Sequence, residues 1–287
     1  MLYYGKSEIL RISGSFMESN YICKKRKWNM RIVIKIGTST LAHAGGRLNI
    51  RRTEELCKVI SDLKNAGMEV ILVSSGAIGM GVGKLSLPGR PSDMATKQAA
   101  AAVGQCELMY VYDKLFSEYN HMVAQILITA SDIRHEDRHR NFSTTLNRLL
   151  ELGVIPVINE NDSVATEEIV IGDNDTLAAI VATSAKAQLL VLLSDIDGLY
   201  TADPKKDPSA SLIREVPELT DAVLALAGDK GSDLGTGGMK TKLSAARICM
   251  EAGCDMIIAN GSDPSLLYDI ADGKPAGTRF IAGRSGK

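Results

Sequence analysis

Residues 154–162 read Val-Ile-Pro-Val-Ile-Asn-Glu-Asn-Asp, an apolar run that ends in a cluster of amides and carboxylates. The run Val154–Ile158 is short and rich in β-branched residues, which is typical of a strand buried on both faces of a parallel sheet. The polar cluster then lies at the carboxyl end of a central strand, where open α/β sheets bind ligands. A second cluster, Gly-Asp-Asn-Asp at 172–175, begins a helical pattern that Asp173 or Asn174 can cap. Because an ordinary Asx-rich loop has the same composition, this segment alone leaves function open.

The composition is that of an ordinary globular protein, with 45% apolar and 23% charged residues in a chain of 287. The formal net charge of -1 gives no electrostatic footprint for nucleic acid, and no segment has the length of a membrane span. The five cysteines form no Cys-x-x-Cys pair, which favours reduced core thiols. We therefore expect a cytoplasmic protein that binds neither nucleic acid nor membranes.

Residues 1–29 differ from the rest of the chain because they mix polar and apolar residues without a clear period. Their basic cluster follows the weakly apolar part, the reverse of the order in a signal peptide, and Glu8 and Glu18 argue against a transit peptide. We expect a loosely ordered extension, with the fold beginning at Met30.

A lysine lies near the end of the predicted strand 31–36, directly before Gly37. Burying Lys35 in an apolar strand is costly unless its ammonium group is paired, so it either binds an anion or snorkels from an edge strand. The next predicted strand, 69–73, leads into Ser-Ser-Gly-Ala at 74–77, where the glycine backbone can approach a carboxylate or phosphate. The glycine spacing here is not that of the dinucleotide-binding fingerprint.

Residues 135–139 match the zinc-protease pattern His-Glu-x-x-His. That motif needs an amphipathic helix and a third ligand, whereas 132–140 is almost entirely charged. We interpret it as a solvated helix start or a loop, and we assign no metal ligands.

Two later segments are suited to a nucleotide. The predicted strand 188–193 ends in a polar, turn-rich segment that begins Ser194-Asp195 and can line a base and ribose, although a plain pair of turns fits equally well. Glycines at 231–238 precede a predicted helix that begins with Met239 and carries Lys240 and Lys242, as a phosphate cradle does.

Strands and helices alternate along the chain, which predicts an α/β fold: a three-layer αβα sandwich with an open, mostly parallel central sheet. Every polar cluster follows a strand, so all should lie on one rim of the sheet. Two lysines that can contact phosphate, an acidic group that organises the site and a small-molecule pocket suit phosphoryl transfer by positioning and charge neutralisation.

From Met30 to Ile281 the chain resembles the amino acid kinase family, with six motifs in the family's order. They are Val33–Ser39, Ser74–Ile78, Pro156–Asp162, Gly172–Asp175, Ser194–Pro204 and Gly235–Lys242. The resemblance implies an amino acid kinase domain at 30–287, with a mainly amino-acid-binding lobe at 30–175 and a mainly nucleotide-binding lobe at 176–287.

The resemblance also implies an activity: ATP-dependent phosphorylation of the γ-carboxylate of L-glutamate, the first step of proline biosynthesis. It suggests Mg²⁺, feedback inhibition by proline, a homo-oligomer (dimer or tetramer) and transfer of the product to glutamyl 5-phosphate reductase. Many bacterial members continue into a C-terminal PUA domain, which we expect this chain to be without, so the resemblance does not fix the strength of control by proline.

The family's functional positions can be matched to this sequence. The catalytic positions fall on Lys35, Asp175 and Lys242, and the glutamate contacts on Ser75, Gly76, Ala77, Asp162 and Asn174. The ATP contacts fall on Lys35, Ser194, Asp195, Thr236, Gly237, Gly238, Met239, Lys240, Thr241 and Lys242. A carboxylate acceptor is already ionised at neutral pH, so the lack of a plausible catalytic histidine is consistent with this chemistry.

Other functions fit the sequence less well. Acetylglutamate kinase, aspartokinase, carbamate kinase and uridylate kinase share the lysines and the sheet, but the paired clusters 159–162 and 172–175 favour free glutamate. A non-catalytic sensor of glutamate or proline has no need of Lys35, Asp175 and Lys242. A dinucleotide-dependent oxidoreductase would need the fingerprint that is missing here.

Overall fold

A computed structural model of the chain describes residues 30–43, 47–164, 173–227 and 238–283. Its strands are β1 (Arg31–Ile36), β2 (Glu69–Ser74), β3 (Val123–Ile128), β4 (Ile155–Glu160), β5 (Leu189–Ser194), β6 (Glu215–Val216), β7 (Asp255–Asn260) and β8 (Thr278–Phe280). Its helices are α1 (Thr38–Leu41), α2 (Ile50–Asn65), α3 (Ala77–Lys84), α4 (Met94–Ser117), α5 (Ala130–Arg134), α6 (Glu136–Glu151), α7 (Asn174–Ser184), α8 (Asp221–Ala225), α9 (Met239–Glu251) and α10 (Leu266–Ala271).

The described strands form one sheet of eight in the order β3-β4-β2-β1-β5-β7-β8-β6. The pairs β3–β4, β4–β2, β2–β1, β1–β5 and β5–β7 are all parallel. Only β8 and β6 run the other way, since β8 is antiparallel to β7 and parallel to β6. The predicted open, mostly parallel sheet is therefore confirmed. The carboxyl ends of β1, β2, β4 and β5 consequently meet at one edge.

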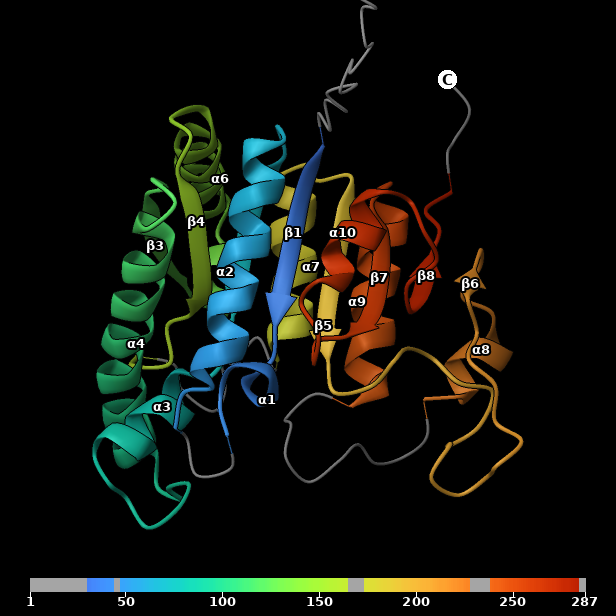
Figure 1. Cartoon of the computed structure of the whole chain (residues 1–287), viewed down its shortest axis with the longest axis horizontal. Coiled ribbons are helices and arrows are strands. Elements are labelled where there is room, and N and C mark those ends of the chain that lie inside the picture. Colours follow the sequence, from blue (N-terminus) through green and yellow to red (C-terminus); the bar gives the residue numbers. More distant parts are fainter. Residues whose placement is uncertain (1–29, 44–46, 165–172, 228–237, 284–287) are drawn as a thin grey trace, which may run out of the picture.

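Helices cover both faces of the sheet (Figure 1). On β1, Ile32, Ile34 and Ile36 belong to a buried cluster with residues of α2, α4 and α10. Val33 belongs to the opposite cluster, with residues of α6, α7 and α9. Because side chains alternate along a strand, Lys35 shares the face of Val33 and lies under α7 and α9.

The predicted strands 31–36, 69–73 and 188–193 lie within one residue of β1, β2 and β5, and α9 begins at Met239 as predicted. Three other segments add to the prediction. Strand β4 is buried along its whole length and extends through Asn159 and Glu160, so half of the first polar cluster belongs to the strand. The glycine-containing run after β2 is not a loop beyond Gly76, because α3 starts at Ala77. Helix α6 takes in the charged residues 136–141. None of the described helices could span a membrane.

The predictions for residues 1–29, for Gly172, and for the glycines before 238 lie outside the described residues. The cysteine prediction holds in part. Cys57, Cys249 and Cys254 are buried free thiols, but Cys106 is exposed on α4, because it lies on the face of the helix turned away from the sheet.

Candidate active site

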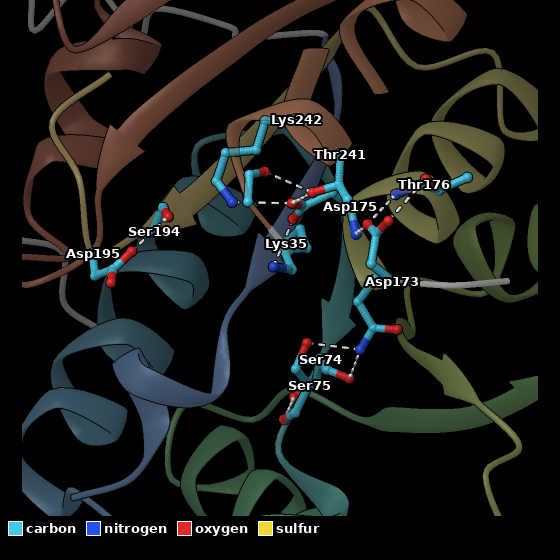
Figure 2. Close-up of polar contacts among 12 residues, drawn as sticks. Lys35, Ser74, Ser75, Asp173, Asp175, Thr176, Ser194, Asp195, Thr241 and Lys242 are labelled. Carbon is cyan, nitrogen blue, oxygen red and sulfur yellow. Dashed lines mark hydrogen bonds and ion pairs between the residues drawn. The ribbon is translucent and has the colours of Figure 1, made fainter. Parts of the chain in front are cut away.

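The carboxyl edge of the sheet brings together side chains from distant parts of the chain (Figure 2). Lys35 comes from β1, Asp175 from the first turn of α7 and Lys242 from the first turn of α9. Ser74 ends β2 and Ser75 follows it on one side of this group, and Ser194 ends β5 and Asp195 follows it on another.

Asp175 holds two lysines, one on each carboxylate oxygen. Its Oδ1 lies 2.7 Å from Nζ of Lys35, and its Oδ2 lies 3.0 Å from Nζ of Lys242. The side chains of Asp175, Lys242 and Lys35 are only 1%, 6% and 12% exposed, so the three charges are largely removed from water. One carboxylate thus pairs with both ammonium groups at the carboxyl edge of the sheet.

Burial tends to raise the pKa of Asp175, but Lys35 and Lys242 outweigh it and hold the pKa below its usual value. The carboxylate is therefore charged throughout the neutral range. Thr241 adds a third contact, since its hydroxyl lies 3.1 Å from Oδ2 of Asp175 and 2.8 Å from the carbonyl oxygen of Gly238.

The start of α7 fixes Asp175 through its cap. Oδ1 of Asp173 accepts hydrogen bonds from the backbone N–H groups of Asp175 and Thr176, at 2.7 and 2.9 Å. An N-cap of this kind satisfies donors that the helix leaves unpaired. The alternative cap considered from the sequence, Asn174, is instead the first helical residue.

Asn174 connects α7 to the end of β2. Its Nδ2 donates to Oγ of Ser75 at 2.7 Å and to Oδ1 of Asn159 at 3.1 Å. Since Oγ of Ser75 accepts this bond, the proton of the hydroxyl remains available for a ligand. Gly76 follows with φ of +102°, a left-handed conformation that favours glycine, and it turns the chain into α3.

Asp162 is half-buried in the segment after β4. Burial raises the pKa of its carboxyl group, and the positive charge of Arg90 opposes part of that effect. No hydrogen bond joins Asp162 to Ser75 or Asn174 in the described structure, so the predicted glutamate contacts are neighbours at one edge rather than one bonded network.

The predicted nucleotide contacts are divided between β5 and α9. Oγ of Ser194 lies 3.2 Å from Oδ1 of Asp195, and Ser194 is buried while Asp195 is exposed. Gly238 is the N-cap residue of α9, and Met239, Lys240 and Thr241 form the first turn, with Lys240 exposed to solvent. Thr236 and Gly237 lie outside the described residues.

Comparison with known proteins decides the family. Residues 30–260 match the profile of the Amino acid kinase family. The chain belongs to this family. Its relatives include the glutamate 5-kinase of Clostridium perfringens, 50% identical over 90% of this chain and 98% of the relative. The glutamate 5-kinase of Listeria innocua is 51% identical over 89% of this chain and 94% of its own length. Within the amino acid kinases, the chain is thus an enzyme of the glutamate 5-kinase group.

Solved structures of other amino acid kinase folds agree on the architecture. An isopentenyl phosphate kinase in a substrate complex covers 88% of this chain and 99% of its own, with a TM-score of 0.62 and 20% identity. The carbamate kinase of Giardia lamblia bound to AMP-PNP covers 88% and 98%, with a TM-score of 0.63 and 18% identity. At these identities the likeness concerns the fold alone.

The two histidines of the His-Glu-x-x-His motif have different hydrogen-bond partners in the structure. His135 lies between α5 and α6, with Nδ1 2.7 Å from the carbonyl oxygen of Ser131. Nε2 of His139 lies 2.7 Å from Oγ of Ser184. Among the described residues, no group of three or more His, Cys, Asp or Glu side chains could hold a metal. Of the two interpretations given from the sequence, a helix start or a loop, the structure shows the helix start, since α6 begins at Glu136.

Two residues of α4 that the sequence did not single out form hydrogen bonds with residues at the ends of β4 and β2. Oε1 of Gln105 accepts from Nδ2 of Asn159 at 2.9 Å, and the hydroxyl of Tyr112 lies 2.9 Å from Oγ of Ser74. The available signal was a polar glutamine in an otherwise small and apolar helical pattern, which alone says nothing about its partner.

Proposed function

We propose that this amino acid kinase transfers the γ-phosphoryl group of ATP to the γ-carboxylate of L-glutamate, giving L-glutamyl 5-phosphate for proline biosynthesis. The observation that carries the proposal is the pair of largely buried lysines on Asp175, next to Ser75 and Asn174. The names of the relatives support glutamate as the acceptor.

In the proposed reaction, an oxygen of the γ-carboxylate attacks the γ-phosphorus, and the bond from phosphorus to the bridging oxygen of ADP breaks. The γ-carboxylate has a pKa of about 4.3, so it is already a nucleophile at pH 7 and needs no general base. The main barrier is repulsion between an anionic acceptor and ATP. Lys35 and Lys242 oppose it by placing positive charge beside the transferring group, where negative charge is spread over oxygens in the transition state.

Recognition of glutamate follows from the hydrogen-bonding capacity of the neighbouring groups. The hydroxyl proton of Ser75 and the backbone N–H groups at Gly76 and Ala77 suit a carboxylate. Oδ1 of Asn174 and the carboxylate of Asp162 are acceptors that suit the α-ammonium group. The set therefore matches a zwitterion with an additional carboxylate.

ATP is assigned to Ser194, Asp195 and the start of α9, where Gly238 to Lys242 offer N–H groups and positive charge to phosphates. Mg²⁺ usually keeps several waters and binds through substrate phosphates and one or two carboxylates, so the described donor set is compatible with a metal that arrives with ATP. When bound, Mg²⁺ neutralises phosphate charge. We further infer inhibition by proline and a homo-oligomeric enzyme from the family resemblance.

The test is ATP turnover with Mg²⁺ and L-glutamate, trapping the acyl phosphate with hydroxylamine. Aspartate, N-acetylglutamate and UMP serve as parallel acceptors. We expect hydroxamate with glutamate alone, in an amount that falls when proline is added. Turnover that prefers another acceptor overturns glutamate as substrate. A shift in melting temperature with glutamate but no turnover with any acceptor indicates a sensor.

The two lysines provide the matching variant test. We expect Lys35→Ala and Lys242→Ala each to lower kcat by at least about 100-fold, because the stabilisation that they give is largest in the transition state. Lys240→Ala is the matched control on the same turn of α9, and its exposed position predicts a smaller loss. Near-normal kcat in either Lys35→Ala or Lys242→Ala contradicts the assignment.

A further inference from the structure

We propose that Gln105 is a positioning residue that fixes the direction of the hydrogen bonds around the amino-acid end of the site. The inference rests on the proposed function, since it concerns the groups assigned there to L-glutamate. Gln105 lies in the middle of α4, a helix that contributes none of the predicted ligand contacts, and its side chain is 7% exposed.

A chain of amides leads from Gln105 to the site. Nδ2 of Asn159 donates to Oε1 of Gln105 at 2.9 Å, while Oδ1 of Asn159 accepts from Nδ2 of Asn174 at 3.1 Å. The same Nδ2 of Asn174 donates to Oγ of Ser75 at 2.7 Å. Each amide in the chain is therefore oriented by its neighbour.

Gln105 has one unsatisfied group. Its Nε2 is buried and has no hydrogen-bond partner in the described part of the chain. Turning the amide over would not remove the problem, because the NH₂ groups of Gln105 and Asn159 would then face each other. A buried unpaired donor destabilises a fold, and such groups in native proteins call for an explanation. The acceptor that Gln105 supplies to Asn159 is that explanation.

The orientation of Asn159 decides what Asn174 presents to a ligand. The backbone N–H of Glu160 donates to Oδ1 of Asn159 at 2.9 Å, which favours the same orientation as Gln105 does. If Asn159 were turned over, its NH₂ group would face the NH₂ of Asn174. Turning Asn174 in response would aim a donor, instead of Oδ1, at the ammonium group of glutamate. Gln105 opposes this reversal because it orients Asn159 from the other end of the chain of amides.

Helix α4 is packed closely against the elements that carry the proposed glutamate contacts. A Cβ atom built on Gly104 would lie 1.8 Å from the carbonyl oxygen of Ala77, so the backbones of α4 and α3 are in direct contact one residue from Gln105. The hydroxyl of Tyr112, two turns further along α4, lies 2.9 Å from Oγ of Ser74. The glutamine is thus held by a helix that is fixed on the same elements that carry the proposed glutamate contacts.

The test compares Gln105→Met, which loses the acceptor, with Gln105→Glu, which keeps an acceptor oxygen in either protonation state. Cys106→Ser, at the exposed neighbouring position, is the matched control. We expect Gln105→Met to raise KM for L-glutamate about tenfold, the effect of one hydrogen bond, while KM for ATP stays unchanged. Its melting temperature should change little, because the unpaired donor of Gln105 is removed while Nδ2 of Asn159 loses its acceptor. Gln105→Glu should return KM to within about twofold of wild type.

The outcomes separate the two levels of inference. Wild-type turnover of glutamate with an unchanged KM in Gln105→Met overturns the positioning role alone. A Gln105→Met protein that is unfolded, or in which both KM values rise as the melting temperature falls, shows a merely structural residue and also overturns it. Wild-type enzyme without glutamate-dependent turnover overturns the proposed function, and this inference with it.

Discussion

Asp162 is a half-buried carboxylate whose surroundings oppose the charge that its proposed role requires. Burial raises the pKa of its carboxyl group, and Arg90 compensates only in part. A carboxyl group with a higher pKa in the folded than in the unfolded chain destabilises the fold when it is ionised. This destabilisation is absent below the unfolded pKa of about 3.9 and is complete once the pH exceeds the folded value.

We therefore expect Asp162→Asn to raise the melting temperature at pH 7 and to raise KM for L-glutamate at least about tenfold. The amide removes the cost of ionisation, but it offers no charge to the substrate ammonium group. The gain in stability should disappear near pH 3, where both side chains are neutral. Thermal unfolding between pH 3 and pH 8, together with steady-state kinetics, measures both effects. A variant less stable than wild type at pH 7 would contradict the assigned pKa direction.

Single residues were predictable from the sequence where a local rule applied. A lysine in an apolar strand predicts an anionic partner, and alternation along β1 places Lys35 on the face of Val33. The residues alone did not identify the partner, because Asp175 is distant in sequence and reaches Lys35 only when α7 covers that face. Gln105 could not have been placed for the same reason, since its partner Asn159 lies on another element.

Helices α3 and α4 are in backbone contact at two glycines. A Cβ built on Gly81 would lie 1.8 Å from the carbonyl oxygen of Ala100, and one built on Gly104 would lie 1.8 Å from that of Ala77. Because Ala77 is the first residue of α3, this contact holds the turn at Gly76 in place.

We expect Gly104→Ala to destabilise the protein by about 1–3 kcal/mol, the usual cost of overpacking, and to raise KM for glutamate more than KM for ATP. The methyl group must push α3 away from α4 and so move Gly76 and Ala77. Gly89→Ala is the matched control, since its added Cβ would have no neighbour within 4 Å. Urea unfolding and kinetics provide the measurements. Equal behaviour of the two alanine variants would show that the helix contact does not position the site.

Long elements with a clear hydrophobic period were predicted well, whereas short or glycine-containing ones were not. Strands β6 and β8 contain two and three residues, which are too few to show a hydrophobic pattern. The antiparallel direction of β8 is set by the way the chain returns to pair with β7. Helix α3 was missed because three glycines at 76–81 resemble a loop, although packing against α4 stabilises the helix.

The sheet order makes β1 the strand where the two proposed halves of the enzyme meet. Its neighbours are β2, which leads to Ser75, and β5, which leads to Ser194. Lys35 on β1 contacts Asp175 on α7, which also contacts Lys242 on α9. One carboxylate thus joins the proposed amino-acid side to the proposed nucleotide side, and its charge affects the stability of the whole fold.

Replacing the carboxylate of Asp175 should lower the free energy of unfolding by an amount that depends on pH. We expect Asp175→Asn to lose about 3–5 kcal/mol of unfolding free energy at pH 7, because two largely buried ammonium groups lose their counter-charge. The two lysines hold the pKa of Asp175 below its unfolded value of about 3.9, so the carboxylate stabilises the fold above that pH and loses this effect as the pH falls through the folded pKa. Urea unfolding curves of wild type and variant should therefore converge in acid. A difference that stays constant down to pH 2 would mean that the amide disturbs packing and that charge is not the cause.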